Sequence, residues 1–199
     1  MQKKVYKFKK YSKRKVFRGD QSILANLFCL ATPEYCSLFK SLNGNLKKLI
    51  KNIANIPGTE LENFTILEVK NKIVGFYSGY SSLEIRNRQL KTSLIMRSLL
   101  KKEKKIFFTK KIQKNINSVP VVNNKSFYIS RNSISLKKQK TGFGSILLNK
   151  ILKDAKSYRS ISLHTNLKNK KANKFYIKHG LNKIKTRNNF ALYEKKLIN

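Results

Sequence analysis

Cysteine is scarce in this chain, which has only two in 199 residues, Cys29 and Cys36. They are seven residues apart in an apolar segment with helical character. That spacing fits neither a zinc site nor a redox pair, so we expect two buried free thiols. Nothing in this cysteine usage indicates an oxidising compartment, and the expected location is the cytoplasm.

The sequence also lacks a long hydrophobic run. The apolar stretch Ile23–Ala31 is interrupted by Asn26, preceded by Asp20 and too short to span a bilayer, so no membrane partner is expected. No internal repeat and no long linker is evident. The length predicts a single domain over residues 1–199, and a hydrophobic content of 40% predicts that it folds.

Acidic residues are few, nine against 45 lysines and arginines, which gives a formal charge of +36. A charge of this size is typical of nucleic-acid-binding proteins, because Lys and Arg neutralise phosphates. However, arginine supplies only eight of the 45, although sites that read bases or grip phosphates favour its planar fork. Lysine, asparagine and isoleucine share A/T-rich codons, so genome composition alone can produce much of this charge. Nine of the basic residues form an N-terminal segment, residues 1–18.

Hydrophobic periodicity predicts helices and strands in alternation. An edge strand is expected at Lys4–Tyr11, followed by an apolar helix from Gln21 with Asp20 as its N-cap. Arg88–Lys102 has helical character, and Phe108, Ile112 and Ile116 follow at helical spacing with lysines between them. This stretch is expected to form a solvated amphipathic helix or a lid over the acceptor site. The remaining expected helices are 33–42, 46–56, 146–156 and 168–178, the last with either Asn166 or Asn169 as its N-cap. The remaining expected strands are 64–69, 73–80, 127–136, 160–165, 181–186 and 190–197.

The most informative segment is 134–145. A strand ending near Leu136 is followed by Gln139-x-x-Gly142-x-Gly144 and then directly by a helix. A strand that breaks at glycines and opens into a helix creates a pocket of backbone N–H groups with a partial positive charge, which suits a pyrophosphate. Taken alone, this two-glycine pattern also fits an ordinary strand–helix turn.

A second block follows, Asn169-x-x-Ala172-x-x-Phe175-Tyr176-x-x-His179-Gly180-Leu181. In order and spacing the two blocks resemble the GNAT superfamily of N-acetyltransferases over about residues 62–197. The first is similar to the family's acyl-CoA pyrophosphate loop. The second is similar to its Asn-x-x-Ala-x-x-hydrophobic-Tyr-x-x-x-Gly-Phe segment, with Leu181 in place of Phe. The resemblance implies an α/β fold with a mixed, mostly antiparallel central sheet, flanking helices and a splayed strand pair that binds acyl-CoA.

The same resemblance implies a site for acetyl-CoA as co-substrate, without a metal. The backbone of Ile134 and Leu136 would pair with the pantetheine arm and leave the thioester near Asn132–Ser133. Asn169 would contact the arm, and Tyr176 would protonate the departing sulfur. The pyrophosphate would lie on the loop formed by Gln139, Lys140, Thr141, Gly142, Phe143, Gly144 and Ser145.

No residue is assigned as the general base. Glu68 and Glu84 are the acids expected nearest the acceptor cleft, but Glu68 reads better as an exposed hairpin residue and Glu84 as the partner of a nearby cation. His164 reads as a strand residue and His179 as a surface residue at a helix end. Deprotonation through water is the other alternative.

The expected activity is direct transfer of acetyl to a primary amine of a small molecule, a protein or an aminoacyl-tRNA. Neither cysteine lies in the matching segments, which argues against a covalent thiol intermediate. The basic surface suggests contact with tRNA or the ribosome, or non-specific polyanion binding. The alternative is a non-catalytic RNA-binding protein on the same fold.

Overall fold

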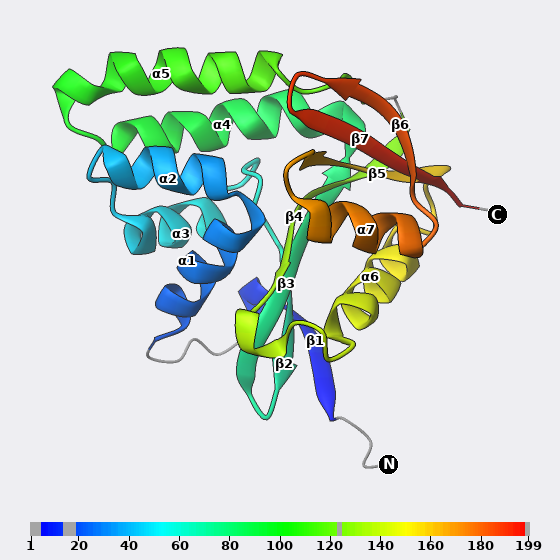
Figure 1. The fold of residues 1–199 in the computed structure, drawn as a ribbon. Coiled ribbons are helices and arrows are strands. Elements are labelled where there is room, and N and C mark those ends of the chain that lie inside the picture. Colours follow the sequence, from blue (N-terminus) through cyan, green and yellow to red (C-terminus); the bar gives the residue numbers. More distant parts are fainter. Residues whose placement is uncertain (1–4, 14–18, 123–124, 198–199) are drawn as a thin grey trace.

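The computed structural model describes residues 5–13, 19–122 and 125–197. A seven-stranded sheet runs through it in the order β1-β2-β3-β4-β5-β7-β6 (Figure 1). Neighbouring strands are antiparallel except for β4 and β5, which are parallel. This mixed, mostly antiparallel sheet confirms the predicted fold class. The strands are β1 (Tyr6–Lys10), β2 (Thr65–Val69), β3 (Lys72–Ser81), β4 (Ser126–Ile134), β5 (Ser160–Asn166), β6 (Asn182–Arg187) and β7 (Phe190–Lys196).

Helices cover both faces of the sheet, and each face has its own hydrophobic core. The helices are α1 (Asp20–Ala31), α2 (Pro33–Ser41), α3 (Leu46–Asn55), α4 (Ile85–Ser98), α5 (Lys102–Asn117), α6 (Phe143–Asp154) and α7 (Lys170–Lys178). One core joins α1–α5 to the sheet, and the other joins α6 and α7 to its opposite face. Because side chains alternate along a strand, Ile66 of β2 enters the first core and Leu67 enters the second.

Most of the predicted elements are present, with shifted ends. The expected first strand is found as β1 at the sheet edge; Lys4, its predicted first residue, lies outside the described residues. Asp20 does not cap α1: it is the first helical residue, and Gly19 precedes it in the left-handed conformation. Strand β4 ends at Ile134 rather than Leu136, because a 3₁₀ turn (η3, Leu136–Lys138) follows Ser135, whose amide still donates to the Val74 carbonyl of β3 at 2.8 Å.

The segment between β3 and β4 contains two helices, α4 and α5. Phe108 and Ile112, whose spacing predicted an amphipathic helix, are buried in the first core, and the lysines between them are exposed. The pattern therefore describes a helix whose apolar face packs on the body of the protein, which agrees with the amphipathic alternative.

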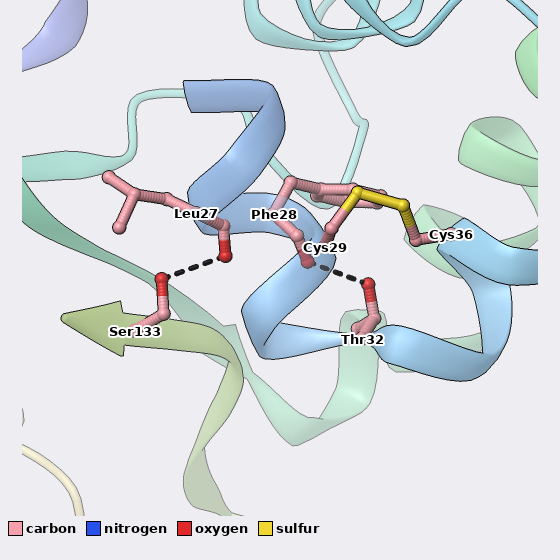
Figure 2. Close-up of a disulfide and its surroundings, with 6 residues drawn as sticks. All are labelled: Leu27, Phe28, Cys29, Thr32, Cys36 and Ser133. Carbon is pink, nitrogen blue, oxygen red and sulfur yellow. Dashed lines mark hydrogen bonds between the residues drawn. A yellow bond between two sulfur atoms is a disulfide. The ribbon is translucent and has the colours of Figure 1, made fainter. Parts of the chain in front are cut away.

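The prediction of free thiols was wrong, because Cys29 and Cys36 form a disulfide (Figure 2). On one continuous helix, residues seven apart would be separated by about 10 Å, too far for a disulfide. Here the chain breaks at Thr32 and α2 runs at 116° to α1, which brings the two Cα atoms within 5.1 Å. The break therefore makes the bond possible.

Two contacts in Figure 2 surround this corner. The Thr32 hydroxyl donates to the Phe28 carbonyl at 3.1 Å, and Ser133 of β4 donates to the Leu27 carbonyl at 2.8 Å. Among the described residues, no single helix is long and apolar enough to cross a membrane; α1 and α2 reach that composition only as a pair, across their bend.

We expect the Cys29→Ser/Cys36→Ser variant to lose about 2–3 kcal/mol of unfolding free energy, as expected for a short closed loop. Equilibrium unfolding in urea, with and without reductant, measures this loss. The Ser37→Ala variant, which changes an exposed residue of the same helix, is the control. Equal stability of the oxidised protein and the double variant would contradict the disulfide's role as a brace for this corner.

Candidate active site

The parallel strands β4 and β5 separate after a short stretch. They pair only at Ser126–Ser160, Phe127–Ile161 and Tyr128–Ser162, whereas β4 continues to Ile134 and β5 to Asn166. On its other side β5 pairs with β7 along its whole length. The strands therefore form a V, and a register shift in the β3–β4 pairing leaves Ser130 of β4 as an extra residue near its apex. This is the splay that the resemblance implies.

The glycine loop lies between the end of β4 and the start of α6. Gln139 folds back and donates its side-chain amide to the Ile134 carbonyl at 3.2 Å. Gly142 adopts φ 89° as the N-cap residue of α6, a conformation that favours glycine. A Cβ at Gly142 would meet nothing within 4 Å, so the outer side of the loop is open. The first amides of α6 have no acceptor within the helix, as at any helix start, and suit an anion there.

Gly144 packs closely against α7, because a Cβ at this position would lie 3.2 Å from the Phe175 ring. This contact is a second reason for a glycine here. That both glycines let phosphate oxygens approach the backbone stays a prediction.

Tyr176 lies on α7 and points toward the V. Its side chain is buried, with 7% exposed, and its hydroxyl donates to Asn132 Oδ1 of β4 at 3.0 Å. Burial raises the pKa of Tyr176 above its ordinary value of 10.0, and the hydrogen bond with Asn132 opposes this more weakly. The phenol is therefore protonated at neutral pH, beside the position expected for the thioester.

The other predicted site residues lie around the same V. Asn169 is the N-cap residue of α7 and accepts from the Ala172 amide at 3.1 Å, so one of the two predicted caps is confirmed. Leu136 lies in η3, with 68% of its surface exposed. The contacts of these residues with acetyl-CoA stay predictions.

Sequence reasoning missed a buried polar cluster beside the extra residue of β4. The Glu60 carboxylate accepts from the Ser130 hydroxyl at 2.8 Å and from Arg131 Nη2 at 3.1 Å. Glu60 and Arg131 are 3% and 8% exposed, so the ion pair is screened from solvent. The Glu60 amide also donates to Thr92 of α4. An arginine within the apolar strand pattern was the only available signal, and nothing near Glu60 indicated its partner.

His164 of β5 is held by two hydrogen bonds, one of them to Tyr128 of β4. Its Nε2 lies 2.8 Å from the Pro120 carbonyl and its Nδ1 lies 3.0 Å from the Tyr128 hydroxyl. A carbonyl only accepts, so Nε2 carries the proton and Nδ1 accepts from Tyr128. Burial lowers the pKa of His164 to about 4, which leaves the ring neutral at pH 7.

The two acids expected near the acceptor cleft are both engaged elsewhere. Glu68 was expected to be exposed but is buried in β2, where its carboxylate lies 3.5 Å from Lys9 Nζ. Glu84 pairs with Arg88 at 2.6 Å, as predicted. His179 is half-buried rather than on the surface, because it packs against the glycine loop. No metal-binding group of three or more ligand residues occurs in the described part of the chain.

Comparison with known proteins gives a family. The model of the acetyltransferase (GNAT) family matches residues 49–181, which is most of the chain and includes both sequence blocks. The chain belongs to the GNAT acetyltransferase family. A search of the curated proteins found no match.

Solved structures of GNAT proteins have the same fold. An N-acetyltransferase from Staphylococcus aureus Mu50 is 18% identical, with a TM-score of 0.60 and coverage of 92% of this chain and 98% of that one. A GNAT family acetyltransferase from Elizabethkingia anophelis, solved with acetyl-CoA bound, is 14% identical (TM-score 0.54, coverage 96% and 98%). The ribosomal-protein-S18-alanine N-acetyltransferase from Escherichia coli is 10% identical (TM-score 0.52, coverage 97% and 94%).

Proposed function

We propose that this GNAT protein transfers acetyl from acetyl-CoA to the primary amine of an acceptor. The observation that carries the proposal is the contact between Tyr176 and Asn132 across the open V, in a fold where a glycine loop leads from β4 into α6. A phenol, a strand edge free of β5 and a helix start on one side of the sheet support the binding of an acyl-CoA there.

The residues fit the molecule in three places. The amides at the start of α6 would hold the pyrophosphate, and the open space outside Gly142 leaves room for it. The edge of β4 beyond Tyr128 is free of β5 and would pair with the pantetheine as an added strand. When bound, acetyl-CoA supplies an activated thioester. Tyr176 would then donate its proton to the departing sulfur, for which a weak acid suffices because a thiolate is a weak base.

We propose direct transfer to the amine, without an acyl-enzyme. Cys29 and Cys36 are joined to each other and therefore offer no thiolate. The acids near the V do not suggest a base: Glu60 is paired with Arg131, and Glu34 accepts from Asn166 at 2.7 Å at the end of β5. We assign no base, and loss of the amine proton to water is the simplest alternative.

The acceptor classes that we propose are small amines, protein amino groups and aminoacyl-tRNA. The charge of +36 supports an acceptor carried by an anionic partner, because a positive surface speeds the encounter with it. The similarity to the Escherichia coli protein, which acts on a ribosomal protein, makes ribosomal proteins reasonable first acceptors to test. The cytoplasm stays our proposed location.

Calorimetric titration of acetyl-CoA into the protein at moderate salt, with ATP as a control, tests the cofactor site. We expect saturable binding near one per chain that ATP does not match and that survives added salt. Release of free thiol on addition of a panel of amines then tests transfer. Equal, salt-sensitive binding of both ligands would overturn the proposal.

We expect Thr141→Glu to weaken acetyl-CoA binding about tenfold or more, because a carboxylate in the loop repels the pyrophosphate. Thr141 is exposed, so the change buries no charge. Thr141→Gln has the same shape without the charge, and Asn149→Glu adds the same charge at an exposed site farther along α6. Calorimetry should show near-native affinity for both controls, and an unaffected Thr141→Glu would mean that the loop does not bind phosphate.

One observation favours a second candidate, a non-catalytic RNA-binding protein. The edge strand β6 is exposed at every position, and three of its six residues are Lys183, Lys185 and Arg187. An RNA-binding role predicts an affinity that falls steeply with salt and that is unchanged by Tyr176→Phe. Fluorescence anisotropy with a structured RNA at several salt concentrations distinguishes it from the enzyme.

A further inference from the structure

The first turn of α6 contacts the residue that follows the end of α7. Ser145, in the first turn of α6, has its hydroxyl 2.8 Å from His179 Nε2. The His179 ring lies beside that of Phe175, with centroids 4.2 Å apart, and Phe175 in turn packs against Gly144. The histidine therefore reaches the loop that we propose for pyrophosphate both directly and through a neighbouring ring.

Hydrogen-bond chemistry fixes the direction of this contact. His179 Nδ1 lies 2.8 Å from the Phe175 carbonyl oxygen, which has no proton to give, so Nδ1 carries the proton. In the neutral ring Nε2 is then an acceptor, and the Ser145 hydroxyl donates to it. The Ser145 proton is then engaged by His179. If the ring gains a second proton, Nε2 becomes the donor and the Ser145 proton is released for another acceptor.

We propose that His179 is a proton-linked positioning residue of the pyrophosphate loop, so that acetyl-CoA binding is coupled to uptake of a proton by its imidazole. The inference rests on the proposed function and adds to it a regulation of the same site by pH. Pyrophosphate oxygens only accept hydrogen bonds, so they favour the state in which Ser145 donates to them and Nε2 donates to Ser145. The imidazolium also brings a positive charge next to the bound anion.

Several cations lie around His179. Lys195 of β7 donates its ammonium to the His179 carbonyl at 3.0 Å, Lys178 precedes it on α7, and Lys183 lies on β6, which α7 contacts. The side chain that meets the ring from α6 is the uncharged Ser145. Among the described residues, no ion pair joins His179 to a carboxylate. A bound pyrophosphate would place negative charge beside these cations and the imidazole. Binding should therefore strengthen as pH falls.

Calorimetric titration at about pH 6 and about pH 8, the range over which histidine commonly titrates, tests the proposal. The wild type is compared with His179→Gln, which keeps a polar group near Ser145 but cannot become charged. Because a phosphate monoester also titrates near pH 6, each measurement is repeated with acetyl-CoA that lacks the 3′-phosphate. Buffers of different ionisation enthalpy then report the protons taken up. Circular dichroism at both pH values confirms that the variant is folded.

For the wild type we expect affinity to rise about tenfold or more from the higher to the lower pH, the scale of one charge-assisted hydrogen bond. This rise should come with net proton uptake, and His179→Gln should show neither. Ser145→Ala should reduce the pH effect, and adding His179→Gln to it should change little. The same pH dependence in wild type and His179→Gln would overturn the inference and leave the enzyme proposal intact. If the wild type bound no acetyl-CoA at both pH values, the proposed function would be overturned, and the inference with it.

Discussion

Replacing Tyr176 by phenylalanine is expected to lower kcat about 100-fold or more, the usual scale for loss of a general acid. The change removes only the hydroxyl that lies 3.0 Å from Asn132 at the opening between β4 and β5. It leaves the glycine loop untouched, so the affinity for acetyl-CoA should stay within about twofold. Thiol release in the steady state measures kcat, and calorimetry measures the affinity.

Tyr193→Phe is the matched control. Tyr193 is a buried tyrosine of β7 whose ring lies 6.0 Å from that of Tyr176, and we give it no role in transfer. Because burial raises the pKa of Tyr176 above 10.0, its proton is retained through neutral and mildly alkaline pH. As the pH is raised to about 10, the wild-type rate should therefore show no decrease that is absent from Tyr176→Phe. If Tyr176→Phe kept its full kcat, the proton donor would have to be sought elsewhere.

The parts of the site that the sequence predicted are local in the chain. The glycine loop, the Asn169 cap and the Tyr176 position each depend on residues within one strand–helix unit, so short spacings were enough to indicate them. The close contact of Gly144 with Phe175 was not predictable in this way, because Phe175 is 31 residues away on another helix.

Contacts between distant segments account for the errors and omissions. Glu60 and Arg131 are 71 residues apart. They are linked through Ser78 of β3, which pairs with Arg131 and donates its hydroxyl to the Glu60 carbonyl. The disulfide depends on the angle between two helices, which hydrophobic periodicity does not give. Glu68 was expected at the surface because its hairpin was seen without β1, the strand that pairs with β2 and brings Lys9 over it.

The second large effect is expected at the Glu60–Arg131 pair. Arg131→Met would leave the Glu60 carboxylate buried without its cation and should lower the unfolding free energy by about 3–5 kcal/mol. Arg131 also donates to the Ser130 carbonyl at 2.7 Å and lies over the Tyr35 ring of α2. Its loss would therefore loosen the contact between α2 and β4 where the V opens. Unfolding in urea measures the change in stability.

Two further variants separate the charge from the packing. Glu60→Gln combined with Arg131→Met removes both charges, so the double variant should be more stable than Arg131→Met alone. Lys150→Met, which breaks a half-exposed pair with Asp154 on α6, should cost about 1 kcal/mol or less. A double variant no more stable than Arg131→Met would place the effect in lost packing against Tyr35 rather than in an unpaired carboxylate. A double variant clearly more stable than Arg131→Met would place the effect in the buried Glu60 carboxylate that the single change leaves without its cation.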